Sequence, residues 1–459
     1  MTEAVAGPRS NRRPGWMRRW ALPVVVAVTI ATAWGADRFL TRSPMAGIVP
    51  GDAEWIAVAG DFPAFWRALE ASDVRSRMAR AGKFPQGEWM RGVRDAFGIR
   101  PTPSRWRNWL GPGLVCARAR GAVGISARPG LLLRTCVFLF APPPDAHGIR
   151  THGDWSYAWR DGFLVASRSP SYVTSALRGD PVDRPAEKVA IDIRWTGAPP
   201  GEVTIRAADG LPVRGKIELE VPPLGAPLTL VDAFPVPAIA AVYGSNAEAL
   251  APVTDALIAW LPGGEFVRDI LLDTVGILPE ESLGDGSESA FAWISVDLAG
   301  NVPIPEWIAL QRRTTAMARL APPAEAVSFE WNGLSGWVLP WVGERLSFCM
   351  AEDGTHRYWA GREGQMPEWA GRLRETPAVD GDIAVEISWD KAALAALQLV
   401  RWAGARELIE RRNSEDVERE LVPRLELLLP LGALRLSGRS DGTSVRFDGH
   451  LAMNPGNES

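Results

Sequence analysis

A seven-residue pattern occurs twice in this chain, as VAIDIRW at residues 189–195 and as IAVEISW at residues 383–389. In both places apolar residues alternate with polar or small residues, and tryptophan is the last residue. A period of two is typical of a β-strand with one face against a core and the other toward water. The pattern therefore predicts two equivalent strands in distant parts of the sequence.

Further matches follow the same order along the chain. GEWMRGVRDAFGIRP from Gly87 matches GEFVRDILLDTVGILP from Gly264; WLG at 109–111 matches SLG at 282–284; WRDGFLVAS from Trp159 matches WVGERLSFC from Trp341; and the Asp-Gly hairpin pattern from Gly201 matches the one from Gly432. Collinear matches indicate a tandem duplication, with repeat 1 at 48–228 and repeat 2 at 229–454. The alternative is two unrelated α+β domains with common strand patterns.

Each repeat begins with a strand and two helical segments, continues as a run of strands, and ends with the heptapeptide strand and a hairpin. The predicted strands are 55–59, 113–119, 121–126, 131–140, 155–159 and 162–167 in repeat 1, and 238–243, 290–298, 306–311, 326–331, 335–340 and 345–350 in repeat 2. Strands without helical crossovers favour antiparallel pairing. The expected fold class is α+β: a duplicated, mostly antiparallel sheet with covering helices, preceded by one transmembrane helix.

The repeats differ at 390–431, where repeat 2 has an insertion with two apolar-periodic helical segments. We expect Pro423 to kink or break the second segment, because proline lacks the amide hydrogen that a helix interior needs. Our interpretation is that this helix pair covers a face of the sheet. A functional role is the alternative, since long structured insertions often carry function.

The N-terminus has the pattern of a membrane anchor. A basic tail at 1–19, with five arginines, precedes an uncharged apolar run at 20–36, and 37–47 is the linker that follows. Basic residues before such a run predict a single-pass inner-membrane protein whose tail is cytoplasmic. The alternative is a signal peptide cleaved after Ala31 and Ala33. Either interpretation places the rest of the chain outside the cytoplasm.

Net charge and cysteine content argue against several kinds of binding site. The net charge of −4 provides no basic field for nucleic acid. The three cysteines are Cys116, Cys136 and Cys349, without a CxxC motif, so zinc-ribbon and thioredoxin-type sites are unsupported. Cys116 and Cys136 are compatible with either a disulfide or buried thiols.

The sequence contains one phosphate-loop spacing, GLPVRGK at 210–216. Ile217 follows where a phosphate loop requires serine or threonine, and the segment alternates as a strand does. Nucleotide binding is therefore not expected. Asp192 and Glu386 occupy matching strand positions and could act as paired carboxylates, but two solvated sheet faces explain them more simply.

The nearest approach to a metal-ligand cluster is the loop PPPDAHGIRTHGDW, which contains Asp145, His147, His152 and Asp154. Histidine and carboxylate side chains at short spacing can bind zinc, but an ordinary solvated loop is the simpler interpretation. His356 is interpreted as a turn residue. With no HExxH or GxSxG motif, the sequence predicts no catalytic residues and no cofactor.

Four tryptophans have no counterpart in the other repeat: Trp155, Trp307, Trp331 and Trp337. Such residues could form an aromatic binding surface for a glycan, a lipid or a protein, but packing in the core or at its rim is the simpler interpretation.

Several longer segments carry a resemblance: PGDAEWIAVAGDFPAFWRAL, FGIRP with the following WLG, WRDGFLVASRSPSYVTSAL and LGALRLSGRSDGTSVRFDGHLA. Together with the N-terminal anchor, they resemble a bacterial family of membrane-anchored extracytoplasmic proteins of unknown function. The resemblance implies location and architecture. We therefore expect a non-enzymatic binding or scaffold module whose partners are the membrane and envelope proteins. The alternatives are carriage of an apolar lipid ligand in a cleft between the repeats, and an envelope hydrolase that uses the His147 and His152 loop.

Overall fold

The computed structural model describes residues 45–74, 111–130, 144–145, 147–197, 199–221, 227–231, 234, 238–245, 287–300, 303–313, 322, 324–331, 333–342, 346–362, 378–409, 413–426 and 428–453. The chain forms two compact units. Unit 1 comprises residues 1–52, 58–63 and 101–186, and unit 2 comprises 53–57, 64–100 and 187–459. The short strand β2 (Trp55–Ala59) and the helix α2 (Phe62–Ala71) contain residues of both units.

Unit 1 contains an antiparallel sheet with the strand order β3–β4–β7–β6–β5. Its strands are β3 (Leu114–Ala119), β4 (Ala122–Ala127), β5 (Arg150–His152), β6 (Trp155–Arg160) and β7 (Phe163–Ser167). A separate two-stranded sheet joins β1 (Met45–Val49) to β8 (Asp180–Asp183). Helix α7 (Pro170–Ala176) packs on the larger sheet, where the Tyr172 ring lies over Gly124 so closely that a Cβ there would come within 2.1 Å of it.

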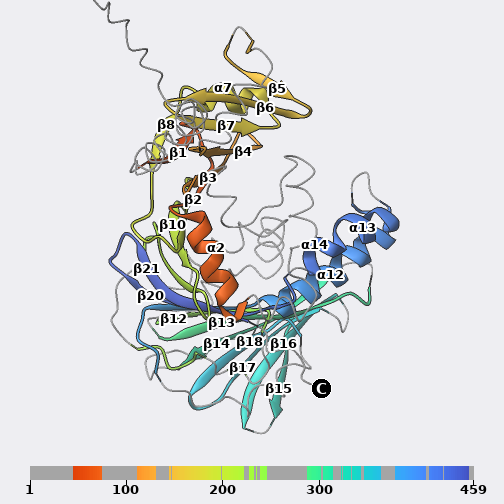
Figure 1. The fold of residues 1–459 in the computed structure, drawn as a ribbon. Coiled ribbons are helices and arrows are strands. Elements are labelled where there is room, and N and C mark those ends of the chain that lie inside the picture. Colours follow the sequence, from red (N-terminus) through yellow and green to blue (C-terminus); the bar gives the residue numbers. More distant parts are fainter. Residues whose placement is uncertain are drawn as a thin grey trace, which may run out of the picture. The chain divides into compact units, whose positions relative to one another are not determined.

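Unit 2 contains a long antiparallel sheet, shown in green to blue in Figure 1. Its strand order is β9–β10–β11–β21–β20–β19–β12–β13–β14–β18–β17–β16–β15. The first group of strands is β9 (Ala190–Trp195), β10 (Gly201–Arg206), β11 (Pro212–Ile217), β12 (Ala240–Gly244), β19 (Ile383–Ser388), β20 (Leu431–Ser440) and β21 (Val445–Met453). The second group is β13 (Ser289–Asp297), β14 (Ile304–Arg312), β15 (Val327–Trp331), β16 (Leu334–Val342), β17 (Leu346–Glu352) and β18 (His356–Ala360).

In the second strand group apart from β15, both faces of the sheet carry buried residues. One face packs on the segment that contains Leu228, Leu230 and Phe234. The opposite face carries an aromatic cluster, described below. Because successive side chains of a strand alternate between the two faces, these strands contain nearly continuous runs of apolar residues.

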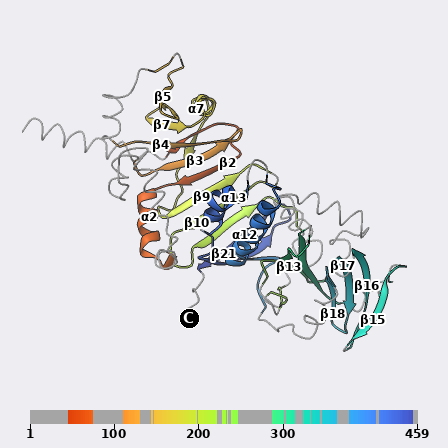
Figure 2. The same ribbon diagram turned by 90° about the vertical axis from the view of Figure 1, so that its right-hand side faces the viewer.

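The inserted segment forms three helices. They are α12 (Trp389–Ala405), α13 (Ser414–Glu420) and α14 (Val422–Glu426), and α12 packs against β20, β13 and β19 (Figure 2). A capping box on Asn413 begins α13. The break between α13 and α14 lies two residues before Pro423, so the predicted interruption is confirmed.

The α+β assignment is wrong. Strands make up 49% of the structure and helices 18%, and antiparallel sheets organise both units. The assignment depended on helices expected between Gly87 and Pro101 and between Asn246 and Pro279, and on the transmembrane helix at 20–36. All three lie outside the described residues, and the described part has no N-terminal helix. None of the helices in the described part of the chain is long and apolar enough to cross a membrane.

The two units share a strand arrangement. In unit 1 the hairpin β3–β4 pairs through β4 with β7 of the later hairpin β6–β7. In unit 2 the hairpin β13–β14 pairs in the same way through β14 with β18 of the hairpin β17–β18. The duplication at 48–228 and 229–454 stays a prediction. The compact units divide elsewhere, because β11 of the first predicted repeat pairs with β21 of the second.

Candidate functional site

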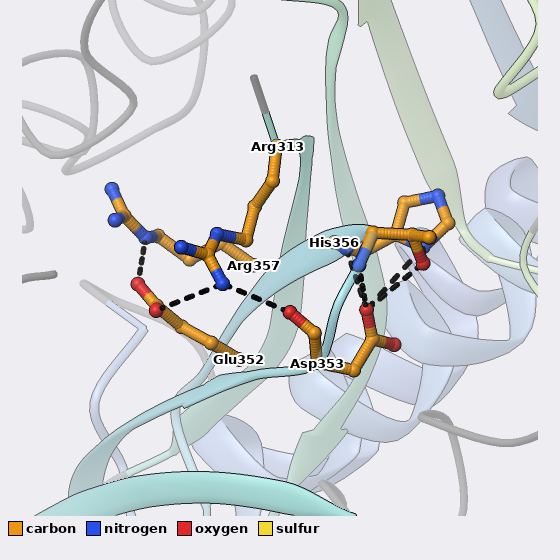
Figure 3. Close-up of polar contacts among 6 residues, drawn as sticks. Arg313, Glu352, Asp353, His356 and Arg357 are labelled. Carbon is orange, nitrogen blue, oxygen red and sulfur yellow. Dashed lines mark hydrogen bonds and ion pairs between the residues drawn. The ribbon is translucent and has the colours of Figure 1, made fainter. Parts of the chain in front are cut away.

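Buried and partly buried ionisable side chains gather at the hairpin between β17 and β18 (Figure 3). We call this group the hairpin cluster; its members are Arg313, Glu352, Asp353, Thr355, His356, Arg357 and Tyr358. Glu352 ends β17 and Arg357 lies opposite it on β18, while Arg313 directly follows β14. The antiparallel register therefore places one carboxylate between two guanidinium groups.

Glu352 is the centre of a buried ion pair. Its Oε1 accepts a hydrogen bond of 2.6 Å from Nε of Arg357, and its Oε2 lies 3.5 Å from Nη1 of Arg313. The side chains of Glu352 and Arg357 are only 6% and 5% exposed. Charges are costly to bury without a partner, so these three residues depend on one another.

Asp353 organises the turn itself. Its Oδ1 accepts hydrogen bonds from the backbone amides of Thr355 and His356, both at 2.6 Å, and its Oδ2 accepts one of 2.7 Å from the Tyr358 hydroxyl. Burial acts to raise the pKa of Asp353, but these hydrogen bonds outweigh it and the pKa is lowered. Burial and the bond to Asp353 raise the pKa of Tyr358. Asp353 is thus an ionised acceptor that fixes the hairpin.

His356 is the first residue of β18, directly after the turn, so its interpretation as a turn residue is wrong by one position. Its Nδ1 lies 2.8 Å from the Thr355 hydroxyl and 4.0 Å from Oδ1 of Asp353. Burial lowers the pKa of His356 below its ordinary value of 6.5; Arg312 acts in the same direction, while Asp353 and Glu288 oppose it. The ring is therefore neutral at pH 7.

This arrangement predicts a loss of stability in mild acid. Because the pKa of His356 is lower in the folded chain, the unfolded chain takes up the proton first as the pH falls below 6.5. The contribution of His356 to stability is complete above pH 6.5 and is lost as the pH falls toward its folded pKa. We expect His356→Gln to flatten this part of the curve of unfolding free energy against pH, measured by urea unfolding. The exposed His152→Gln serves as the control, and an unchanged slope in His356→Gln would contradict the assignment.

A second group of polar side chains, around Glu288, lies in the same sheet. The carboxylate of Glu288 accepts hydrogen bonds from the Thr229 amide and, at 2.6 Å each, from the Thr229 hydroxyl and the Leu230 amide. Arg312 completes it as an ion pair at 3.6 Å. Both buried glutamates are thus used to hold protein segments in place.

The metal candidates do not converge in the described structure. Oδ1 of Asp145 accepts hydrogen bonds from the amides of His147 and Ile149, at 2.9 and 2.8 Å, and so closes its own loop. His152 ends β5, and Asp154 lies in the next turn. Among the described residues, no group of three or more histidine, cysteine or carboxylate side chains could hold a metal ion.

The two candidate carboxylates, Asp192 and Glu386, each make contacts with a different neighbouring strand. Oδ1 of Asp192 accepts a hydrogen bond of 2.7 Å from the Thr204 hydroxyl on β10, and Glu386 pairs with Arg435 on β20 at 3.1 Å. Each contact crosses from a strand to its own neighbour. The lysine of GLPVRGK lies on β11, as the strand interpretation of that segment predicted.

The cysteines are described in part. Among the described residues, neither Cys116 nor Cys349 forms a disulfide bond, and burial raises the pKa of the Cys116 thiol. Cys136 lies outside the described residues.

Two of the four candidate tryptophans lie in one aromatic cluster of unit 2. This cluster consists of Phe291, Trp307, Trp337, Phe348 and Trp359, with neighbouring ring centroids 5.5–6.2 Å apart. Trp337 and Trp359 are buried, and within the described structure their indole nitrogens have no hydrogen-bond partner. Trp359, which was not among the sequence candidates, lies two residues after Arg357 on the same face of β18.

The other two candidates are not members of this cluster. Trp155 begins β6 of unit 1, where the guanidinium of Arg168 lies 5.9 Å from its ring centroid. Trp331 ends β15 and is 41% exposed. Register places Trp331 on the sheet face opposite Trp337.

Among the described strands, β15 lies at the end of the unit 2 sheet. Within the described structure it pairs with β16 alone, and Figure 2 shows it as the outer ribbon of that sheet. Its side chains Val327 and Trp331 are 62% and 41% exposed, and Phe329 between them packs over Gly336. This edge combines open main-chain groups with exposed apolar side chains, the combination by which a sheet binds another strand.

Comparison with known proteins gives no relative: no protein-family model, no curated protein and no solved structure matches this chain.

Proposed function

We propose that this chain is a membrane-anchored extracytoplasmic protein that acts as a non-enzymatic binding or scaffold module. The arginine-rich tail and the apolar run at 20–36 support the location. The exposed edge strand β15 is the observation that carries the binding role. In this proposal the partners are proteins of the cell envelope.

The hairpin cluster supports a structural role near that edge. Glu352 and Asp353 accept hydrogen bonds from side chains and amides of the same hairpin, and Glu352 lies across the sheet from Ser335 of β16. The ordered β17–β18 hairpin thus supports β16, the strand on which β15 rests. The hydrogen bonds and ion pairs of the hairpin cluster therefore serve to hold the edge of the sheet in place.

A test compares two double variants of the full-length chain in membranes. Val327→Lys/Trp331→Lys places charges along the edge of β15, which opposes strand addition. Leu394→Lys/Leu408→Lys makes the same kind of change at exposed positions outside the sheet. After chemical cross-linking and purification, we expect wild type and the Leu394→Lys/Leu408→Lys variant to retain the same partner. The Val327→Lys/Trp331→Lys variant should lose at least about nine-tenths of it.

Equal recovery of the partner by all three chains would contradict a role for β15. Absence of any partner, with wild type included, would contradict the binding function altogether.

The aromatic cluster favours a second candidate function, the binding of an apolar ligand. A buried indole N–H without an acceptor is unfavourable, and a lipid ester or hydroxyl oxygen would satisfy it. Lipid that co-purifies with the wild-type chain, detected by mass spectrometry, would favour this candidate over the first.

A further inference from the structure

The strand β15 itself lacks several of the features that keep edge strands from pairing. Its sequence is VSFEW, with one charged residue, no proline and no lysine, and no bulge interrupts its pairing with β16 between Val327 and Trp331. Val327, Phe329 and Trp331 share one face of the sheet, while Ser328 and Glu330 share the other. The strand is therefore fully amphipathic along an open edge.

The hairpin register indicates which main-chain groups face outward. Trp331 and Leu334 are paired across a two-residue loop, and the pair that flanks such a loop exchanges hydrogen bonds. Because hydrogen-bonded pairs alternate along an antiparallel ladder, Trp331, Phe329 and Val327 direct their amides and carbonyls toward β16. The amides and carbonyls of Ser328 and Glu330 then face the open side.

The pattern of β15 is complementary to itself. In an antiparallel pair of two copies with a two-fold axis at Phe329, Val327 lies opposite Trp331 of the other copy, and Phe329 lies opposite its own counterpart. Ser328 lies opposite Glu330, so their outward amides and carbonyls exchange hydrogen bonds and the serine hydroxyl can donate to the carboxylate. Apolar side chains thus meet on one face and hydrogen-bonding side chains on the other.

Charge selects this register over its neighbour. An axis at Glu330 would place two carboxylates directly opposite each other, which destabilises a strand pair. An axis at Ser328 would leave Trp331 without a strand residue opposite it. The axis at Phe329 avoids both penalties and uses all five residues.

The same chain already extends its sheet in this manner. The outer strands of two hairpins, β11 of β10–β11 and β21 of β20–β21, pair antiparallel from Pro212 with His450 to Ile217 with Val445. Edge-to-edge joining of hairpins is therefore an arrangement that these sequences support.

We propose that β15 pairs with β15 of a second copy of this chain, antiparallel about a two-fold axis at Phe329, so that the protein is a dimer joined through one continuous sheet. This inference rests on the proposed function, because it names the partner of the same edge.

The test uses full-length chains with two different tags, expressed together in membranes and oxidised. One chain carries Ser328→Cys and the other Glu330→Cys, positions that the register places opposite each other at a Cα separation of about 5.5 Å, suitable for a disulfide. We expect the mixed pair to give at least about fivefold more disulfide-linked dimer than either variant alone, because residues shifted by two lie about 7–8 Å apart.

Two outcomes overturn the proposal. One is equal yield from the mixed pair and from Ser328→Cys alone. The other is equal yield from Val123→Cys, an exposed position on β4 of unit 1 that controls for random collision. As a second measurement, sedimentation in detergent should show that Val327→Lys/Trp331→Lys raises the dimer dissociation constant by at least about tenfold, whereas Leu394→Lys/Leu408→Lys does not. A monomeric wild-type chain would also overturn it.

The cross-linked products distinguish a failure of the dimer from a failure of the proposed function. Cross-linked products that contain another envelope protein but no second copy reject the dimer and retain the binding module. Products of neither kind reject both.

Discussion

Replacement of Glu352 by alanine is expected to lower the free energy of unfolding by about 3–5 kcal/mol. The substitution leaves the Arg357 guanidinium, 5% exposed, without the carboxylate that lies 2.6 Å from its Nε, and it also removes the ion pair with Arg313. A buried charge that loses its partner costs far more than a surface pair, because water cannot replace the lost interaction. Urea unfolding of the detergent-solubilised chain, followed by tryptophan fluorescence, measures the change.

The control removes an ion pair of similar length from the surface. Glu418 lies 2.7 Å from Arg401, but both side chains are about half exposed, so Glu418→Ala is expected to leave the unfolding midpoint within error of wild type. If Glu352→Ala behaved as the control does, Glu352 would not be the buried centre of the hairpin cluster.

Replacement of Trp359 by alanine is expected to cost about 3–5 kcal/mol of unfolding free energy. Trp359 is 1% exposed and packs against Trp337 and Phe348, so alanine leaves a large cavity at the centre of the aromatic cluster. Trp359→Phe should lose less than half as much, since phenylalanine keeps an aromatic ring there and removes an indole N–H that has no acceptor in the described structure.

Urea unfolding of both Trp359 variants separates packing from polarity. A loss in Trp359→Phe as large as that in Trp359→Ala would show that the indole N–H binds something, and would favour the apolar-ligand candidate. A loss under about 1 kcal/mol in Trp359→Ala would contradict the burial of this residue.

Alternation of apolar and polar residues was sufficient to find most strands. The heptapeptides form β9 and β19, and the closing hairpins form β10–β11 and β20–β21, at or near the predicted positions. The period of two is a local consequence of one buried face, and so it can be read from a few residues. The tryptophans at the ends of the heptapeptides differ, however: Trp195 ends β9 and Trp389 begins α12.

Pairing could not be read in the same way. The sequence pattern matched residues 159–167, which span β6 and β7, with residues 341–349, which span the end of β16 and the start of β17. In the structure, the strand arrangement relates β6–β7 to β17–β18 instead. The strand β18 was missed, because the segment 356–360 begins with two polar residues and both of its faces are buried. Strands β1 and β8 were missed because they are short and pair only with each other. Strand partners depend on contacts between distant residues, which a local pattern does not contain.

The hairpin cluster was equally beyond the sequence. Glu352 and Arg357 lie on the same face as Met350 and Trp359, so charged residues continue an apolar stripe. The charged residues within the apolar stripe were the only sign of the cluster in the sequence. They indicate an ion pair only when the strand register is known, because the register places Glu352 opposite Arg357. Arg313 follows a different strand, and nothing in its neighbourhood predicts its contact with Glu352.

We propose that β15 is a binding edge outside the cytoplasm. The test places a photoreactive residue at position 331 and measures photo-cross-linking in intact cells, with position 394 on α12 as the control. A membrane-impermeant reagent that quenches the photoreactive residue reports location, because it reaches only residues outside the cytoplasm. We predict protein cross-links from 331 that exceed those from 394, and quenching at 331 without cell lysis. Equal cross-linking from both positions, or quenching only after lysis, would contradict it.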